Sequence, residues 1–163
     1  MTQKAIVVTH NGGMRFTAEN ADGKTLVMDE GPDGAGPTPI QTLLASLAGC
    51  TGMDVISILR KKRQDVTGYS IETTADQRSD YPMVFTRIDI IHAVDGNAID
   101  EGAVRRAVEL SALKYCPVSA MLCAGTAEVH HRYRIRDVAN GRSIEGEVAV
   151  RGPGAPAEIA VGA

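Results

Sequence analysis

Gly36-Pro-Thr-Pro-Ile-Gln-Thr-Leu-Leu-Ala-Ser-Leu-Ala-Gly-Cys-Thr-Gly-Met-Asp54 is the segment on which the predicted fold depends. It begins with a helix-start signal, because Thr38 can cap the helix with its hydroxyl and Pro39 suits the first helical position. Gln41 occupies the place of a capping-box partner. Residues 43–59 are apolar on nearly every side, which predicts a helix that is buried all round.

Cys50 stands in the middle of this helix, between Gly49 and Thr51-Gly52. Two glycines in a helix interior cost about 1 kcal/mol each relative to alanine, so we expect a close approach that needs them. One interpretation is a buried cysteine that fills a small gap in the core. The other is a helix that delivers a reactive thiol to an enclosed site. Because apolar surroundings raise the pKa of a thiol, the second interpretation requires a cation from elsewhere in the chain.

The overall composition suits one globular domain of 163 residues with a real core. The 17 basic and 20 acidic side chains give a net charge of −3 without a basic patch, which argues against nucleic acid as a partner. The start of the chain does not resemble a signal peptide, and the apolar helix, interrupted by Asp54, reads as too short for a membrane span. We therefore expect a cytoplasmic protein without a membrane partner, whose three cysteines are reactive or buried rather than a disulfide framework.

Strands and helices are predicted in runs, which favours an α+β fold with antiparallel sheets around the buried central helix. The expected strands are residues 5–10, 14–19, 25–29, 69–75, 84–93 and 127–135, and an amphipathic helix covers 99–115. Residues 1–136 form the predicted domain. Residues 137–163 form a peripheral or weakly ordered extension, in which 143–150 could add an edge strand. Since a small chain cannot bury a wholly apolar helix by itself, we expect a second subunit to cover it.

Cys116 lies at the break Tyr115-Cys-Pro117, where proline favours the first turn of a short helix that runs to Cys123. A cysteine at a helix N-terminus has its thiolate stabilised by free backbone N–H groups, and Lys114 is close in sequence. The alternative is a core cysteine before a proline. Cys123 follows two turns later, roughly 10 Å along the helix, which exceeds the Cα separation of about 7 Å that a disulfide tolerates. If any pair forms, Cys50 with Cys116 is the sensible one.

Arg15, in the second predicted strand, is either an ordinary outward-facing arginine or a fixed positive charge that stabilises a thiolate and holds a peroxide oxygen. Asp54 is interpreted as structural, because a carboxylate beside a thiol discourages its ionisation. The histidines show no metal-ligand spacing with the cysteines: His10, His92, His130 and His131. We therefore predict neither a metal nor a bound cofactor.

Three motifs of the chain resemble the OsmC/Ohr family of osmotically inducible protein C and organic hydroperoxide resistance proteins. They are Gly13-Met-Arg-Phe16, the central segment from Pro37 to Asp54 that contains Cys50, and Lys114-Tyr-Cys-Pro-Val-Ser119. The resemblance runs from about Lys4 to Ile135 and does not cover the tail from residue 136.

The resemblance implies an OsmC-like fold and an intertwined homodimer, whose two central helices pack at the middle and whose active sites lie between subunits. It also implies a thiol peroxidase that reduces organic hydroperoxides or hydrogen peroxide in oxidative-stress defence. In that family, Cys50 matches the peroxide-attacking cysteine, Cys116 the resolving cysteine and Arg15 the arginine that activates the thiolate. An external dithiol would restore the thiols.

One departure from the family pattern concerns the residue that orients the arginine. The hydroperoxide resistance members carry a glutamate just before the central helix, where this chain has Ile40 and Gln41. Gln41 can accept a hydrogen bond but brings no charge, so it is assigned a supporting role and the chain is placed in the broader OsmC-like branch. The alternative function is a non-catalytic dimer of the same fold that binds a small hydrophobic ligand.

Overall fold

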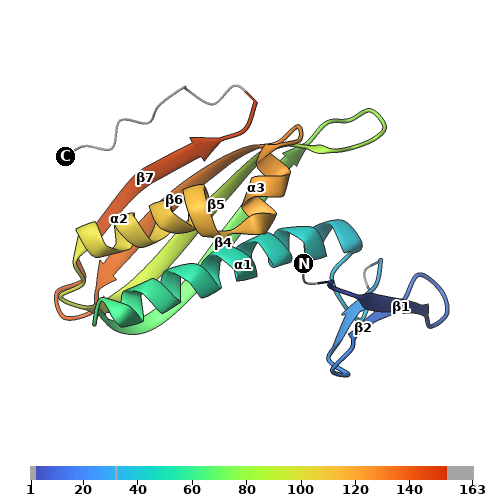
Figure 1. Ribbon diagram of the computed structural model, residues 1–163, viewed down its shortest axis with the longest axis horizontal. Coiled ribbons are helices and arrows are strands. Elements are labelled where there is room, and N and C mark those ends of the chain that lie inside the picture. The colour runs from blue at the N-terminus through green and yellow to red at the C-terminus, as the bar shows by residue number, and fades with distance from the viewer. Residues whose placement is uncertain (1–2, 32, 154–163) are drawn as a thin grey trace. The chain divides into compact units, whose positions relative to one another are not determined.

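The structure is a computed structural model that describes residues 3–31 and 33–153 (Figure 1). In chain order its elements are β1 (Ile6–His10), β2 (Phe16–Asn20), β3 (Thr25–Met28), α1 (Pro39–Lys61), β4 (Asp65–Gln77), β5 (Phe85–Asn97), α2 (Glu101–Leu110), the π-helical turn η1 (Ser111–Tyr115), α3 (Pro117–Cys123), β6 (Glu128–Asp137) and β7 (Ser143–Arg151). The α+β class is confirmed. The chain divides into two compact units, residues 1–45 and 46–163, and each is described by itself.

The first unit contains the predicted antiparallel meander, with strand order β1-β2-β3. β2 begins one residue after Arg15, so this arginine lies in the β1–β2 turn rather than in the strand. The turn is closed by two backbone hydrogen bonds, from the Asn11 N–H to the Arg15 carbonyl and from the Arg15 N–H to the Gly12 carbonyl. Gly12 and Gly13 have φ of 92° and 57°, a region that glycine adopts without strain.

The predicted capping box at the start of α1 is confirmed. The Gln41 N–H donates to Thr38 Oγ1 over 3.3 Å, and the Thr38 N–H donates to Gln41 Oε1 over 2.9 Å. Two backbone donors at the helix start are thereby satisfied reciprocally. The carboxamide oxygen of Gln41 therefore serves the start of the helix.

The second unit is built on a four-stranded sheet of order β4-β5-β6-β7. β4 and β5 form the long antiparallel pair expected from their alternating sequences, and β6 pairs antiparallel with β7. β5 and β6 run parallel, so the sheet is mixed. A parallel neighbour needs a long crossover, which α2, η1 and α3 supply between these two strands.

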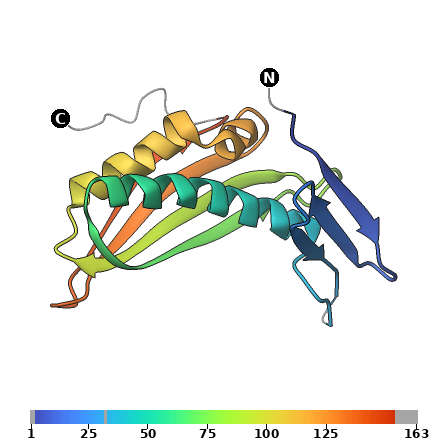
Figure 2. The ribbon, with the colours of Figure 1, turned by 60° about the horizontal axis from the view of Figure 1, so that its bottom comes forward.

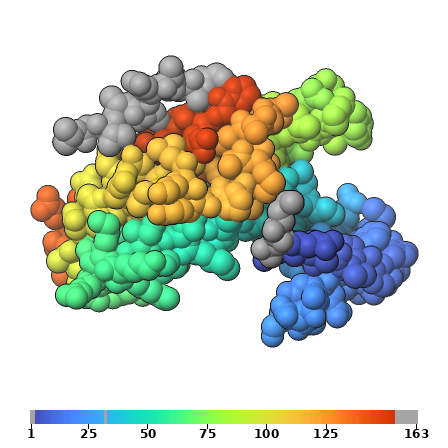
Figure 3. Space-filling view, viewed as in Figure 1, coloured from blue at the N-terminus to red at the C-terminus, as the bar shows by residue number. Residues whose placement is uncertain are grey.

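All the helical segments of this unit lie on one face of the sheet (Figures 1 and 2). Between them and the sheet lies the core cluster of Val55, Leu59, Val94, Ala103, Val104, Ala107, Val108, Tyr133, Ile135 and Val148. In the space-filling view the green atoms of the later part of α1 adjoin the yellow and orange atoms of α2, η1 and α3 (Figure 3). The core is therefore a helical layer packed on a sheet.

Within one chain the central helix α1 is buried on one face, so the expected burial all round depends on the predicted second subunit. Its buried residues are Leu47, Thr51, Gly52, Val55 and Leu59. Leu47, Thr51, Val55 and Leu59 recur every four residues and Gly52 lies next to Thr51, so these positions share one side of the helix. On another side the Met53 side chain is 75% exposed. A single chain therefore leaves part of this apolar helix uncovered, and the predicted second subunit stays a prediction.

One of the two interior glycines of α1 has the expected packing reason. A Cβ on Gly52 would lie 2.3 Å from Cδ1 of Ile71, a residue of β4, so the helix approaches the sheet at this point. A Cβ on Gly49 would meet nothing within 4 Å in the part of the chain that the structure describes.

Within the described residues, α1 alone is long and apolar enough, by length and composition, to cross a membrane. It has 23 residues, so the sequence argument that it is too short does not hold. Core helices of globular proteins meet the same criterion, and this one packs one face into the core cluster. Length and composition alone thus do not identify a span.

The predicted edge strand at residues 143–150 is present as β7. Val148 and Ala149 on this strand are 5% and 3% exposed, so the strand contributes to the core as well as to the sheet edge. That packing goes beyond the peripheral role predicted for residues 137–163. Residues 154–163 lie outside the described part, and the division into a domain and an extension stays a prediction.

Candidate functional site

The fold brings two thiols of the second unit together although they stand 66 positions apart in sequence (116 − 50). Cys50 lies on α1 and is half-buried, while Cys116 lies between η1 and α3 and is buried. The Cys50 side chain is a neighbour of Cys116 and contributes to the rise in the pKa of that thiol. Both are free thiols. The pair that the sequence argument favoured is therefore adjacent.

Cys116 is the N-cap of α3, as predicted from the proline that follows it. Its backbone is extended (φ −75°, ψ 105°), which is the conformation that a following proline favours. Its Sγ accepts a hydrogen bond from the Ser119 N–H over 3.3 Å, and its own N–H donates to the Ser111 carbonyl over 3.0 Å, a π-helical bond. Cap and turn fix the position of this sulfur.

Of the two interpretations of Cys116, the structure supports the core cysteine before a proline rather than the stabilised thiolate. The pKa of Cys116 is raised to about 12, chiefly by burial and in smaller part by the adjacent Cys50. The N–H groups of Ser119 and Val118 lower this pKa, as expected at a helix start, but they do not offset the loss of hydration. Cys116 is thus held as a neutral thiol in the reduced protein.

The third cysteine, Cys123, is at the other end of α3 from Cys116. Its Sγ lies 3.9 Å from Ser119 Oγ, which in turn lies 3.1 Å from Nε2 of His131. Burial raises the pKa of Cys123 and lowers that of His131 to about 4. This cluster therefore consists of neutral groups.

In the first unit, Arg15 has an acidic partner that the sequence argument missed. Its Nε donates to Asp29 Oδ2 over 2.9 Å. Asp29 also accepts from the N–H groups of Ala35 and Glu30, and these bonds together with the Arg15 contact lower the pKa of Asp29. Asp29 is 7% exposed, whereas the Arg15 side chain is 47% exposed. A buried carboxylate thus anchors the arginine at Nε, and Gln41 is used elsewhere.

A chain of buried polar groups links α1 to the η1 turn and the sheet. Ser111 Oγ donates to Asp54 Oδ2 over 2.9 Å and lies 2.8 Å from Thr51 Oγ1. Thr51 Oγ1 lies 3.4 Å from His92 Nε2, and Tyr69 Oη lies 2.7 Å from His92 Nδ1. Thr51 and Asp54 follow Cys50 on the same helix, one and four positions later.

The donor and acceptor of each hydrogen bond in this network follow from the number of hydrogens that each group carries. Ser111 gives its one hydroxyl hydrogen to Asp54, so Thr51 must donate to Ser111. Thr51 then accepts from Nε2–H of His92, whose Nδ1 accepts from the Tyr69 hydroxyl. This assignment needs a neutral imidazole, and burial lowers the pKa of His92 to about 3. The network is therefore fully satisfied and ends on the Asp54 carboxylate.

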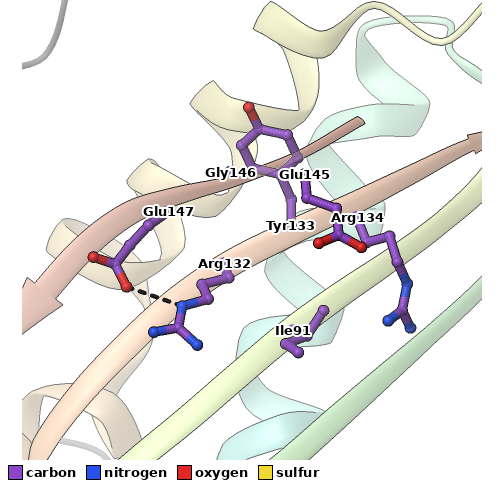
Figure 4. A pocket seen from close by; sticks show the side chains of 7 residues that line it. All are labelled: Ile91, Arg132, Tyr133, Arg134, Glu145, Gly146 and Glu147. Carbon is purple, nitrogen blue, oxygen red and sulfur yellow. Dashed lines mark hydrogen bonds and ion pairs between the residues drawn. The ribbon is translucent and has the colours of Figure 1, made fainter. Parts of the chain in front are cut away.

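A hollow on the sheet of the second unit contains no thiol (Figure 4). It is lined by Ile91, Arg132, Tyr133, Arg134, Glu145, Gly146 and Glu147. Arg132 pairs with Glu147 over 2.9 Å, and Arg134 pairs with Glu72 of β4. Its charges are thus largely matched within the sheet. Across residues 3–31 and 33–153, no three His, Cys, Asp or Glu side chains are grouped to hold a metal ion.

Comparison of the sequence with known proteins identifies the family of this chain and its relatives. The family model described as OsmC-like protein matches residues 31–132, more than half of the chain. The chain belongs to the OsmC family. Protein YhfA of Escherichia coli K12 is 37% identical to this OsmC-family chain over 123 residues, which are 76% of this chain and 91% of YhfA.

Solved structures give the same fold assignment for this OsmC-family chain. A hypothetical protein from Aquifex aeolicus VF5 superposes with a TM-score of 0.72 at 28% identity, over 83% of this chain and 98% of its own. An OsmC-like protein from Mycoplasma pneumoniae superposes with a TM-score of 0.70 at 15% identity, over 84% and 98% respectively. The second likeness shows the fold alone.

Two residues of the site were not singled out from sequence. Asp29 follows a short strand, and nothing local indicates that it pairs with an arginine 14 positions earlier. Ser111 did carry a signal, because it falls on the apolar stripe of the amphipathic helix with Val104 and Val108. A hydroxyl on a core-facing stripe must find a buried partner, and here it finds Asp54 and Thr51.

Proposed function

We propose that this OsmC-family protein is a cysteine-dependent peroxidase that reduces organic hydroperoxides or hydrogen peroxide. The observation that carries the proposal is the asymmetric thiol pair: a half-buried Cys50 beside a buried Cys116, brought together from distant parts of the chain. The family resemblance supports the same reaction.

The chemistry of the proposed cycle balances in three steps. The Cys50 thiolate attacks the peroxide O–O bond and takes one oxygen, so that Cys50 becomes a sulfenic acid; the other oxygen leaves as an alcohol or water, with the proton that the Cys50 thiol gave up. The Cys116 thiol then attacks that sulfur, and its proton leaves with the sulfenic hydroxyl as water, which gives a Cys50–Cys116 disulfide. An external dithiol is oxidised to its own disulfide as it returns both protein thiols.

The different roles proposed for Cys50 and Cys116 follow from the environment of Cys116. A thiolate is the attacking species, and a pKa of about 12 leaves Cys116 almost entirely protonated at neutral pH. Peroxide therefore meets Cys50 first. Cys116 becomes useful only after Cys50 has been oxidised to an electrophilic sulfenic acid.

Arg15 is proposed as the positive charge that activates the Cys50 thiolate, with Asp29 as the carboxylate that orients it. In this proposal Asp29 orients Arg15 in place of the glutamate that precedes the helix in the hydroperoxide resistance members. The orientation of Arg15 then does not require a charge at Gln41. The contact between Arg15 and Asp29 supports this part of the proposal.

A homodimer is part of the same proposal. Large apolar side chains remain exposed on the helical side of the second unit: Met53, Leu113, Tyr115 and Met121. A second copy packed there would cover them and enclose Cys50. We also propose a cytoplasmic location, an external dithiol as reductant, and activity without a metal or bound cofactor.

Thiol titration before and after one equivalent of cumene hydroperoxide tests the reaction. The expected result is the loss of two thiols per chain as a Cys50–Cys116 disulfide, with recovery in dithiothreitol. Cys50→Ser should abolish peroxide consumption, whereas Cys116→Ser should leave Cys50 as a sulfenic acid that dimedone traps. If wild type and Cys50→Ser consume peroxide equally slowly, the proposal fails and a ligand-binding role is favoured instead.

A further inference from the structure

Ser111 contacts both of the segments that carry the paired thiols. Its hydroxyl bonds to Asp54 and Thr51 of α1, four and one positions after Cys50. Its carbonyl accepts the N–H of Cys116 across the η1 turn. This fully buried residue therefore joins α1 to the backbone of Cys116.

The η1 turn is also held from the sheet, because Arg151 of β7 donates to the Ala112 carbonyl over 2.8 Å. Pro117 has no N–H to give to η1, and the π-helical turn is a looser hydrogen-bonding arrangement than the α-helix before it. Leu113, Lys114 and Tyr115 of the turn are exposed. Among the hydrogen bonds of the described residues, those of Ser111 are the ones that join η1 to α1.

We propose that Ser111 is the positioning residue that keeps the Cys116 sulfur beside the Cys50 sulfur. It does not touch the reacting atoms. Instead, its link to Asp54 confines the reduced thiols to a narrow range of separations, so that less conformational freedom is lost when the disulfide forms. The inference rests on the proposed function only in taking the Cys50–Cys116 disulfide as the redox product.

The test is a redox equilibrium that involves no peroxide. The full chain is incubated with mixtures of oxidised and reduced glutathione, quenched in acid and alkylated, and the disulfide fraction is measured by mass spectrometry. One oxidised glutathione takes two electrons and two protons from the protein dithiol and becomes two reduced molecules. The equilibrium constant is then the effective concentration of the two thiols.

Ser111→Ala should lower this effective concentration about tenfold, the factor that corresponds to one hydrogen bond to a charged group. The matched control is Tyr133→Phe. Tyr133 is also buried, and its hydroxyl also donates to a carboxylate, Glu101 on α2. Its side-chain hydrogen bond is to α2 and not to α1 or η1, so Tyr133→Phe removes a buried hydroxyl without removing a link between those two segments. The control should lower stability to urea while leaving the effective concentration within twofold of wild type.

Each outcome decides the inference. A fall of fivefold or more in Ser111→Ala with an unchanged control supports it. Equal values for Ser111→Ala and wild type, or an equal fall in Tyr133→Phe, overturn it.

If Ser111→Ala does not fold, Asp54→Ala removes the same link from the half-buried α1 side and is judged by the same thresholds. If wild type forms no Cys50–Cys116 disulfide in any mixture, the disulfide step of the proposed function and this inference both fail.

Discussion

Two fully buried histidines make the stability of this protein sensitive to mild acid. Burial is the largest cause that lowers the pKa of His92 to about 3 and that of His131 to about 4. The charge of His131 further lowers the pKa of His92, and the charges of Arg151 and His130 further lower that of His131. In the unfolded chain both side chains should titrate near the ordinary value of about 6.5. The native state therefore binds fewer protons than the unfolded state wherever the pH lies between these limits.

The size of the effect follows from this difference in proton uptake. Well above pH 6.5 both histidines are neutral in the native and in the unfolded state, so their titration does not lower the free energy of unfolding. As the pH falls, the unfolded chain gains protons and stability is lost by up to about 1.4 kcal/mol per unit for each histidine. Between pH 8 and pH 5 this amounts to about 2 kcal/mol for each and about 4 kcal/mol for both. That loss is a large part of the roughly 5–15 kcal/mol of an ordinary domain.

Urea unfolding at one fixed protein concentration and a series of pH values from 8 to 5 measures this loss. The window ends at pH 5 because acidic groups with a lowered pKa, such as Asp89 and Glu147, add their own losses below it. His92→Gln and His131→Gln should each be less stable than wild type at pH 8, yet each should lose only about 2 kcal/mol on acidification. A wild-type stability that stays flat from pH 6.5 to 5, or slopes unchanged in both variants, would refute the reasoning.

Three further predictions concern α1 and the candidate site. Gly52→Ala should destabilise the fold by about 1–3 kcal/mol in urea unfolding, and adding Ile71→Val should recover most of that loss by removing the methyl group that the new Cβ would strike. Asp29→Asn should slow peroxide consumption about tenfold in kcat/KM, because Arg15 loses its ionic anchor; a rate equal to wild type would remove Asp29 from the site. In the reduced protein at pH 8, iodoacetamide should modify Cys116 at least tenfold more slowly than an unburied cysteine, with the rate still rising above pH 10 in a mass-spectrometric time course.

The parts of the fold that sequence predicted well are those fixed by local chemistry. The capping box of Thr38 and Gln41, the cap at Cys116 and the antiparallel pair of β4 and β5 all depend on residues near one another in sequence or on alternation along one strand. The parallel pairing of β5 with β6 depends on where the chain returns after a helical crossover. Alternation within one strand carries no information about the direction of its neighbour.

The candidate site shows the same limit at the level of charge. Sequence could place Cys116 at a helix start, where backbone N–H groups favour a thiolate, but it could not show how deeply the sulfur is buried. Burial outweighs the cap and reverses the direction of the pKa shift. In the same way, the missing glutamate before α1 suggested a weakly held Arg15. Sequence could not reveal Asp29 as its partner, because this contact joins the end of β3 to the β1–β2 turn.

The burial of Cys116 also determines which half of the proposed cycle is demanding. An external thiolate can reach the half-buried Cys50 sulfur of the disulfide more readily than the buried Cys116 sulfur. Attack there expels the Cys116 thiolate, and a thiol with a pKa of about 12 is a poor leaving group. The Ser119 N–H, already bonded to this sulfur, is the group in place to stabilise the departing charge. In the proposed cycle, the burial that leaves Cys116 protonated should therefore also slow the return of the thiols, so the choice of reductant should influence turnover more than the choice of peroxide.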